Sequence, residues 1–392
     1  MTEEVLIPCL YDGKNQWERG KLLAISSNIT GQEIDDMLAL AYESGVSDVN
    51  FSSGDFVFFD IYGRLTKASS RKLLESELQM ILTHLIDTGA PATLSSGIDI
   101  NRTVEIKPTG TRNKAYRFRF NAVRARIGKI GTGVQITMRT IPQIPVELST
   151  LKLPQTMQDA MFPENGLILV VGITGSGKTT LLYSVLRFVV ETMADIKVIT
   201  HESPVEYTFE HVKCAGMMPS QIEVPFDLPN YEVCVEAAMR RASEYILFGE
   251  CRKRDEFGAM VNAALSGHAT FTTLHAETVD QTVNRILNMF PFDEQQSIAD
   301  KLLGSLRLIV AQKLIKTSDG KRAPVREWLV FDDEIKERLA QIPFVEWSRV
   351  IREEVKSKNQ RLKDSAKALF DEGRVDRSQF ISSMGCTPES VH

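Results

Sequence analysis

The chain has 392 residues, of which 43% are hydrophobic and 25% charged, a composition typical of a globular protein with two or three domains. The net charge of −5 gives no general attraction to nucleic acid or anionic lipid, so we expect no specific nucleic-acid binding. The five cysteines form no C-x-x-C pair, which favours a reducing cytoplasm over a disulfide framework or a zinc site. No apolar run approaches the ~18 residues that cross a bilayer, so we expect no transmembrane segment.

The first 145 residues predict a small α+β domain. Residues 1–20 are polar and predict an irregular arm. Apolar side chains recur at helical spacing over residues 31–44, and residues 46–65 then alternate with the period of two that is typical of strands. The same two patterns predict one more helix and three more strands, at 73–88, 102–107, 115–123 and 133–140.

Two prolines within residues 141–145 predict a stiff, extended linker at the end of this domain. Strands and helices then alternate from residue 167 to about 331, which predicts a parallel α/β sheet in a domain over 146–335. The last part, 336–392, is charged and helical, and residues 355–371 predict a single exposed amphipathic helix.

A glycine loop carries the strongest chemical signal. Residues 172–179 read Gly-Ile-Thr-Gly-Ser-Gly-Lys-Thr and fit G-x-x-x-x-G-K-[ST], between a predicted strand at 167–171 and a predicted helix at 180–193. Glycines let backbone N–H groups turn onto phosphate oxygens, and the helix N-terminus adds its positive end. A chance match occurs in on the order of one per cent of chains of this length. The loop therefore predicts binding of a nucleoside triphosphate through Gly172, Thr174, Gly175, Ser176, Gly177, Lys178, Thr179 and Thr180. Lys178 is expected to reach the β- and γ-phosphates, and Thr179 to ligate Mg²⁺.

Acidic residues that follow two later strands are candidates for managing Mg²⁺ and water. The apolar strand at 245–248 leads into Glu250, while Gly249 stands where many such enzymes have Asp. Glu250 is expected to be the catalytic base or to hold Mg²⁺ through water, although without the loop an ordinary acid at a strand end would be the better interpretation. Glu202 ends another strand and is expected to face the metal, whereas Glu206 could be a solvated turn residue.

Histidines fall into two groups. His201 and His211 are expected to be polar surface residues. His268 and His275 stand seven apart around a short strand that should lie beside the glycine loop, which favours a role in sensing the γ-phosphate. A metal site there is not favoured, because no third ligand is apparent nearby.

Taken together, residues 46–326 resemble the secretion-ATPase superfamily, the motors of type II and type IV secretion and of type IV pili. Motifs similar to those of the family occur in order: Val46-Ser-Asp-Val-Asn-Phe, Arg117-Phe-Arg119-Phe-Asn121, Arg139-Thr-Ile-Pro142, the Walker A loop, the Asp box from His201 to Tyr207, the Walker B segment from Phe248 to Arg252 and the His box from Gly267 to His275. The pattern is most similar to the PilT-like branch, and within it to the DotB- and TraJ-type motors of Dot/Icm (type IVB) secretion and I-type conjugation.

The resemblance implies a RecA-like P-loop ATPase domain, preceded by a smaller PAS-like α+β domain and followed by a helical tail. It implies a homohexamer that binds ATP and Mg²⁺, is cytoplasmic, and lies at the inner membrane through partner proteins of a membrane-embedded secretion complex. The implied catalytic residues are Glu250, Glu202, His268, His275, Arg119 and Arg139, the two arginines acting as an arginine finger would, with Thr179 and Glu250 at the metal.

The chain departs from the family pattern at several positions, among them Ser203 in the Asp box and Lys253 after the Walker B arginine. Three other functions remain open on the residues alone. They are a pilus-retraction ATPase, a nucleotide-driven translocase acting on DNA, and a nucleotide-binding subunit that does not hydrolyse. The acidic balance and the lack of a basic stripe interleaved with aromatics weigh against the DNA translocase.

Overall fold

The computed structural model describes residues 6–8, 17–18, 20–61, 63–108, 114–128, 131–141 and 144–391. The chain divides into two units, Met1–Gln143 and Ile144–His392. The predicted linker at 141–145 spans this division, and its residues 142 and 143 lie outside the described residues.

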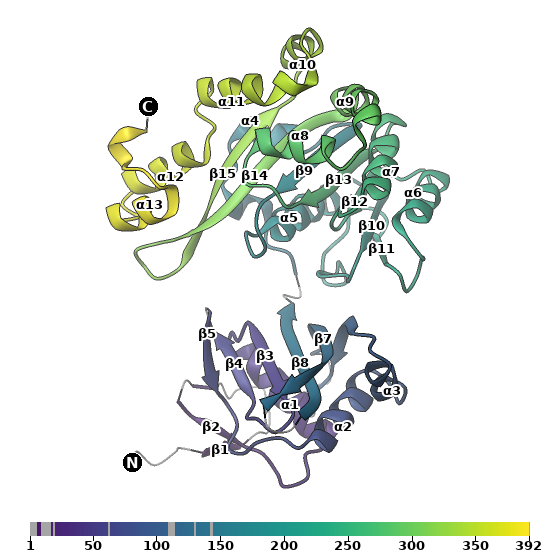
Figure 1. Cartoon of the computed structure of the whole chain (residues 1–392), viewed down its shortest axis with the longest axis vertical. Coiled ribbons are helices and arrows are strands. Elements are labelled where there is room, and N and C mark those ends of the chain that lie inside the picture. The colour runs from purple at the N-terminus through teal and green to yellow at the C-terminus, as the bar shows by residue number, and fades with distance from the viewer. Residues whose placement is uncertain are drawn as a thin grey trace. The chain divides into compact units, whose positions relative to one another are not determined.

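The first unit is built on an antiparallel sheet of six strands in the order β5-β4-β3-β8-β7-β6 (Figure 1). The strands are β3 Asp48–Ser52, β4 Phe58–Ile61, β5 Arg64–Lys67, β6 Ile100–Ile106, β7 Tyr116–Ile127 and β8 Gly131–Ile141. Alternate residues of β7, such as Phe118 and Phe120, are buried in one core. The helices α1 Gly31–Glu43, α2 Glu75–Leu85 and α3 Ala90–Ser95 pack on that core. The helices and strands predicted over residues 31–140 are therefore confirmed.

The predicted irregular arm is wrong for the residues that the structure describes. Strand β1 Leu6–Pro8 pairs in parallel with β2 Leu22–Ala24. Trp17 is buried, its ring lies edge-on to Phe59 at 5.1 Å, and its Nε1 donates to the carbonyl of Lys21. One large aromatic side chain is sufficient to anchor an otherwise polar segment to a core.

The second unit is an α/β fold with a seven-stranded sheet in the order β11-β10-β12-β13-β9-β14-β15. Its strands are β9 Gly166–Val171, β10 Val198–Glu202, β11 Ser220–Glu223, β12 Tyr245–Phe248, β13 Ala269–Leu274, β14 Leu306–Lys316 and β15 Arg322–Val330. Neighbouring strands are parallel except for β14 and β15, which form an antiparallel pair. The predicted parallel sheet is thus confirmed, with one antiparallel strand at its edge.

Helices cover both faces of this sheet, as Figure 1 shows. The core on one face contains residues of α6 Tyr231–Arg240, α7 Arg254–Leu265, α8 Val279–Leu287, α9 Phe292–Ser305, α10 Asp333–Ala340 and α11 Trp347–Ser357. The core on the other face contains residues of α4 Gln155–Ala160 and α5 Lys178–Thr192. Every residue of β9 is buried, because alternate side chains enter the two cores. This double burial explains its continuous apolar sequence.

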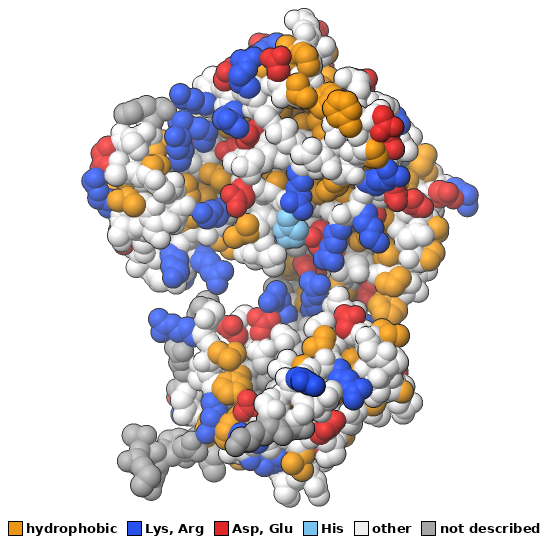
Figure 2. All heavy atoms as spheres, viewed as in Figure 1, with side chains coloured by type: hydrophobic (Ala, Val, Ile, Leu, Met, Phe, Trp, Pro, Cys, Tyr) orange, Lys and Arg blue, Asp and Glu red, His pale blue; other side chains and the backbone are white. Residues whose placement is uncertain are grey.

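The C-terminal segment belongs to the second unit. The single exposed helix predicted over 355–371 is wrong, because α11 ends at Ser357 and a new helix, α12 Leu362–Asp371, follows. Between them Asn359 has a φ of 54°, a left-handed conformation that cannot continue a helix. One side of α11 is buried in the main core, while Lys and Arg side chains gather over α11 and α12 on the face in Figure 2. A short helix, α13 Arg377–Met384, packs against α12. Among the described residues no helix is long and apolar enough to cross a membrane.

Candidate functional site

The glycine loop connects β9, in the middle of the sheet, to the N-terminus of α5. Its backbone requires glycine at its start, because Gly172 has a φ of 153°. A Cβ at this position would lie 2.3 Å from the carbonyl oxygen of Gln312 and 2.5 Å from Ser176 Oγ. The loop is therefore held tightly against β14, and its hollow opens at the carboxyl end of β9.

Lys178 lies in the first turn of α5 and folds back over the loop. Its Nζ donates to the carbonyl oxygens of Gly172 at 2.8 Å and Ile173 at 3.0 Å. Burial lowers the pKa of the Lys178 ammonium, and the nearby carboxylates of Glu250 and Glu206 partly oppose that shift. A buried cation whose hydrogen bonds go to two neutral carbonyls is well placed to exchange them for anionic oxygens.

The hydroxyl groups around the loop differ in their surroundings. Ser176 Oγ is buried and has no hydrogen-bond partner among the described residues. Thr180 Oγ1 lies 3.1 Å from the hydroxyl of Tyr207 and so is engaged within the fold. Thr179 is partly exposed at the start of α5, and Thr174 and Gly175 lie exposed at the tip of the loop. Buried hydroxyl groups normally have a hydrogen-bond partner. A bound ligand could supply the one that Ser176 Oγ lacks among the described residues.

Glu250 lies just beyond β12 and is held on both sides. Arg252 NH2 lies 2.7 Å from its Oε2, and His275 Nε2 lies 2.7 Å from its Oε1. Burial opposes ionisation of this carboxyl, but the hydrogen bond and charge of Arg252, together with His275, lower its pKa. Glu250 is therefore ionised near neutral pH and can accept a proton.

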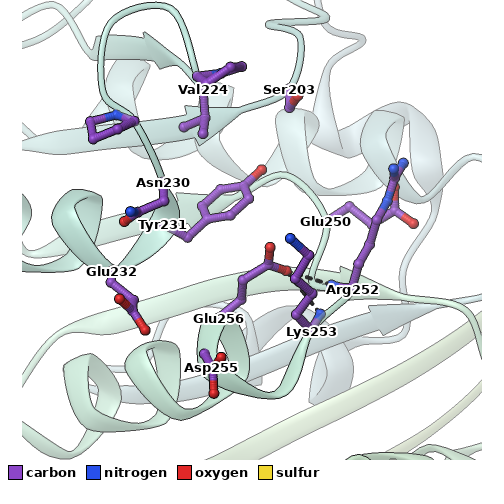
Figure 3. Close-up of a pocket in the computed structure, with 12 residues that line it drawn as sticks. Ser203, Val224, Asn230, Tyr231, Glu232, Glu250, Arg252, Lys253, Asp255 and Glu256 are labelled. Carbon is purple, nitrogen blue, oxygen red and sulfur yellow. Dashed lines mark hydrogen bonds and ion pairs between the residues drawn. The ribbon is translucent and has the colours of Figure 1, made fainter.

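Figure 3 shows how the backbone positions Arg252 beside Glu250. Glu256, in the first turn of α7, accepts hydrogen bonds from the backbone N–H groups of Arg252 at 2.9 Å and Lys253 at 3.0 Å. A carboxylate at this position caps the helix and fixes the segment that precedes it. These residues line a cavity of about 430 Å³, into which Tyr231 also projects.

The two candidate histidines lie at opposite ends of β13. His275 follows the carboxyl end of the strand, reaches Glu250, and lines a second cavity of about 480 Å³ with Gly172 and Thr174. His268 precedes the amino end, where its Nδ1 lies 2.6 Å from the carbonyl oxygen of Ser243. A six-residue strand separates them by roughly 20 Å. The expectation that His268 senses the γ-phosphate bound to this loop is wrong for a single chain.

Glu202 does not face the loop. Its carboxylate is fully buried, with its Oε1 accepting hydrogen bonds from the hydroxyls of Tyr183 and Thr200. Burial raises its pKa to about 7, although these hydrogen bonds favour the ionised form. The expectation that Glu202 faces the metal is therefore wrong for this structure, because the carboxylate is buried and hydrogen-bonded to Tyr183 and Thr200.

Glu206 is the acid that sequence reasoning did not select. It is partly exposed in the turn after β10, and it is close enough to Lys178 to raise the pKa of that ammonium. Glu250 acts on the Lys178 ammonium in the same direction. The sequence does not show which of Glu202 and Glu206, four residues apart, lies nearer to the glycine loop. That depends on where the turn directs each side chain.

Arg285 is a second residue that the sequence did not reveal. It projects from α8 and lines the cavity that Gly172, Thr174 and His275 also line. An arginine on the polar side of an amphipathic helix is usually solvated, so no local pattern singles it out.

His201 is buried, which makes the prediction of a surface residue wrong. Neither ring nitrogen has a hydrogen-bond partner among the described residues, and the ring stacks on Phe248 at 5.3 Å. Burial lowers the pKa of this imidazole to about 4, so it is neutral near pH 7. His211 is exposed, as expected.

Arg119 and Arg139 lie in the first unit as directly paired residues of β7 and β8. Their side chains point away from the core, because the neighbouring Phe118, Phe120 and Met138 are buried. Arg139 Nε donates to Asp48 at 2.8 Å. Their contribution to a nucleotide site stays a prediction.

Within the described part of the chain, no group of three or more His, Cys, Asp or Glu side chains could hold a metal ion by itself. The donors near the loop are the hydroxyl of Thr179 and the carboxylates of Glu250 and Glu206. Oxygen donors of this kind fit Mg²⁺, which proteins usually bind with one or two carboxylates together with substrate phosphates. The residues present are thus compatible with Mg²⁺ that arrives with a nucleotide.

The family model described as "Type II/IV secretion system protein" matches residues 35–375. The chain belongs to this family. The resemblance to the secretion ATPases is therefore confirmed.

Solved structures of the DotB ATPase are similar over nearly the whole chain. DotB of Legionella pneumophila is 34% identical, with a TM-score of 0.82 over 93% of this chain and 99% of that one. DotB of Yersinia pseudotuberculosis is 25% identical, with a TM-score of 0.78 over 95% of each chain. The type IV pilus retraction ATPase PilT of Pseudomonas aeruginosa is 26% identical over 76% of this chain and 82% of its own. The α/β fold therefore matches those of ATPases.

Proposed function

We propose that this chain is an ATP-hydrolysing motor that powers a type IVB secretion or conjugation apparatus. The observation that carries the proposal is the loop lysine, Lys178, lying close to the two carboxylates of Glu250 and Glu206. A phosphate-binding cation beside a base and a second acid is what phosphoryl transfer to water requires. Identity of 34% to DotB over nearly the whole chain favours the type IVB machine.

In this proposal each residue of the site has a separate task. Lys178 exchanges its two carbonyl partners for the β- and γ-phosphate oxygens, and the N–H groups of the loop bind the same phosphates. Thr179 and Glu206, with Glu250 acting through a water, would hold Mg²⁺, which would neutralise part of the phosphate charge. Glu250 also accepts a proton from the attacking water, and His275 orients the Glu250 carboxylate.

The proposal also covers the larger assembly. The second unit acts as a RecA-like P-loop domain, and the first as a PAS-like domain whose Arg119 and Arg139 contact nucleotide as an arginine finger would. Six copies form a ring in the cytoplasm, which reaches the inner membrane through partner proteins of the secretion complex. The similarity to DotB ATPases extends over both units.

Phosphate release by the purified chain tests the chemistry. We expect ATP turnover by the wild type, no turnover and weak nucleotide binding by Lys178→Ala, and no turnover with retained ATP binding by Glu250→Gln. The matched control is Glu236→Gln, an exposed acid paired with Arg240 on α6, which should behave as wild type. Hydrolysis at the wild-type rate by Glu250→Gln would contradict the assignment of the base.

Pilus retraction is the second candidate, because PilT is 26% identical over 76% of the chain. Such a motor would hydrolyse ATP in the same way, but it would act on a pilus instead of a secretion apparatus. Affinity capture from the native host, with components identified by mass spectrometry, separates the two. Secretion-core proteins support the type IVB assignment, and pilus platform proteins contradict it.

A further inference from the structure

A buried side-chain link connects the glycine loop to two strands at the edge of the sheet. Gln312 Nε2, on β14, donates to the carbonyl oxygen of Ser176 at 2.8 Å. Its Oε1 accepts from Arg326 Nε at 2.8 Å, across the register pair of β14 and β15. The two side chains are 4% and 7% exposed, so both hydrogen bonds are shielded from water.

Arg326 is an unusual residue at such a position. Its remaining side-chain hydrogen bond goes to the backbone carbonyl of Leu151 at 3.3 Å, and its backbone N–H donates to Ser365 Oγ of α12. No ion pair joins Arg326 to a carboxylate within the described residues, and burial lowers the pKa of the guanidinium to about 10. Burying a charged guanidinium among neutral partners costs free energy. In return, Arg326 constrains the side chain of Gln312.

The effect of Arg326 on Gln312 follows from donor and acceptor counting. A glutamine amide has an oxygen that accepts and a nitrogen that donates, and it can otherwise adopt either orientation. Arginine only donates, so only the oxygen of Gln312 can face Arg326. The NH₂ group must then face the carbonyl of Ser176, as the structure shows.

The effect of Gln312 on the loop follows from the planar peptide. In a trans peptide the C=O of Ser176 and the N–H of Gly177 point in opposite directions. Holding the carbonyl against Gln312 therefore directs the N–H of Gly177 away from β14 and toward the hollow of the loop. Gly177 has a φ of 84° and no Cβ, so its own conformation restricts this peptide little.

We infer that Gln312 is a positioning residue that aims the Gly177 N–H at a bound phosphate, and that Arg326 fixes the orientation of the Gln312 amide. The inference rests on the proposed function, because it requires a phosphate-bearing ligand at the loop. It extends that function to two residues on β14 and β15, more than a hundred positions after the loop in the sequence.

Gln312→Glu tests the inference directly. The variant keeps an oxygen for Arg326 but places a second acceptor against the Ser176 carbonyl. We expect the Kd values for ATP, ADP and inorganic tripolyphosphate to rise by a similar factor of about ten. We expect the KM for ATP to rise by a similar factor and kcat to change less. Tripolyphosphate has no base or sugar, so a common factor assigns the loss to phosphate binding.

The matched control is Gln295→Glu. Gln295 Nε2, on α9, also donates to a backbone carbonyl, that of Phe290 at 3.1 Å, but away from the loop. We expect this variant to keep wild-type affinity for all three ligands. Equal loss in both variants, or wild-type affinity in Gln312→Glu, would overturn the inference. Failure of the wild type to bind any nucleotide would instead remove the proposed function.

Arg326 variants provide a second test in case Gln312→Glu does not fold. Arg326→Met removes the donor that fixes the amide, whereas Arg326→Lys retains one. We expect weaker tripolyphosphate binding in Arg326→Met and near-wild-type binding in Arg326→Lys, with circular dichroism confirming that both are folded. Equal affinities of these two folded variants would contradict the role of Arg326.

Discussion

The imidazole Nε2 of His275 lies 2.7 Å from Oε1 of Glu250, while Arg252 occupies the other carboxylate oxygen at 2.7 Å. Both oxygens of the proposed base are thus held before any ligand binds. Each oxygen can accept a second hydrogen bond, so Glu250 can receive a proton from water while these partners fix its orientation. Arg252 has a largely exposed side chain, which makes it the easier of the two to displace.

Replacement of Arg252 should shift the pH dependence of hydrolysis. Arg252 lowers the pKa of Glu250, so Arg252→Ala should raise that pKa. A base is active above its pKa, and activity is lost as the pH falls through it. The acidic limb of kcat/KM should therefore move to higher pH, whereas Lys253→Ala, which changes the adjacent exposed cation, should leave it in place. An unchanged limb in Arg252→Ala would show that Glu250 ionisation does not control the rate.

The two acids of the turn after β10 should differ in their effect on turnover. Glu206 is close to Lys178, so Glu206→Gln should lower kcat at least about tenfold in a phosphate-release assay. Glu202 is buried against Tyr183 and Thr200, so Glu202→Gln should remain within about threefold of wild type. The reverse order of effects would restore Glu202 as the metal-facing acid.

Glu202→Gln should also change stability in a pH-dependent way. Burial raises the folded-state pKa of Glu202 to about 7, above its usual value of 4.5. As the pH rises between these values, the unfolded chain releases a proton that the folded chain retains, so the wild type loses stability. Glutamine cannot ionise, and Glu202→Gln avoids this loss.

The variant should therefore be more stable than wild type at pH 8, by at most about 3 kcal/mol, and similar to wild type below pH 4.5. Urea unfolding at several pH values measures the difference. Glu236→Gln on the surface serves as the control and should show no such trend. A difference that did not grow with pH would show that the pKa of Glu202 is not raised in the folded chain.

The docking of the C-terminal helices can be tested at Trp347. This side chain is 4% exposed at the start of α11, and its Nε1 donates to the carbonyl of Leu339 at 2.8 Å. Trp347→Phe removes the hydrogen bond and part of the buried surface, and should lower the free energy of unfolding by about 2 kcal/mol. Val345→Ala, at a well-exposed neighbour, should change it by less than about 0.5 kcal/mol in the same urea titration. Equal effects would mean that α11 is not docked as described.

Local sequence determined much of this protein. The glycine loop, its buried strand and its helix lie within residues 166–192, so their pattern could be interpreted without distant contacts. Glu250 could be selected for the same reason, because it lies two residues after a short apolar strand. The order of motifs was also sufficient to identify the family that the match over residues 35–375 establishes.

Tertiary structure decided which side chains meet at the loop. The direction of β13 brings His275 to Glu250 and places His268 at the far end of the sheet. The course of the chain after β10 leaves Glu206 partly exposed near Lys178 and buries Glu202 against Tyr183 and Thr200. The link from Gln312 to Arg326 exists only because β14 lies between β9 and β15. Sequence spacing specifies the element that carries a residue, but strand direction, register and neighbours specify what its side chain reaches.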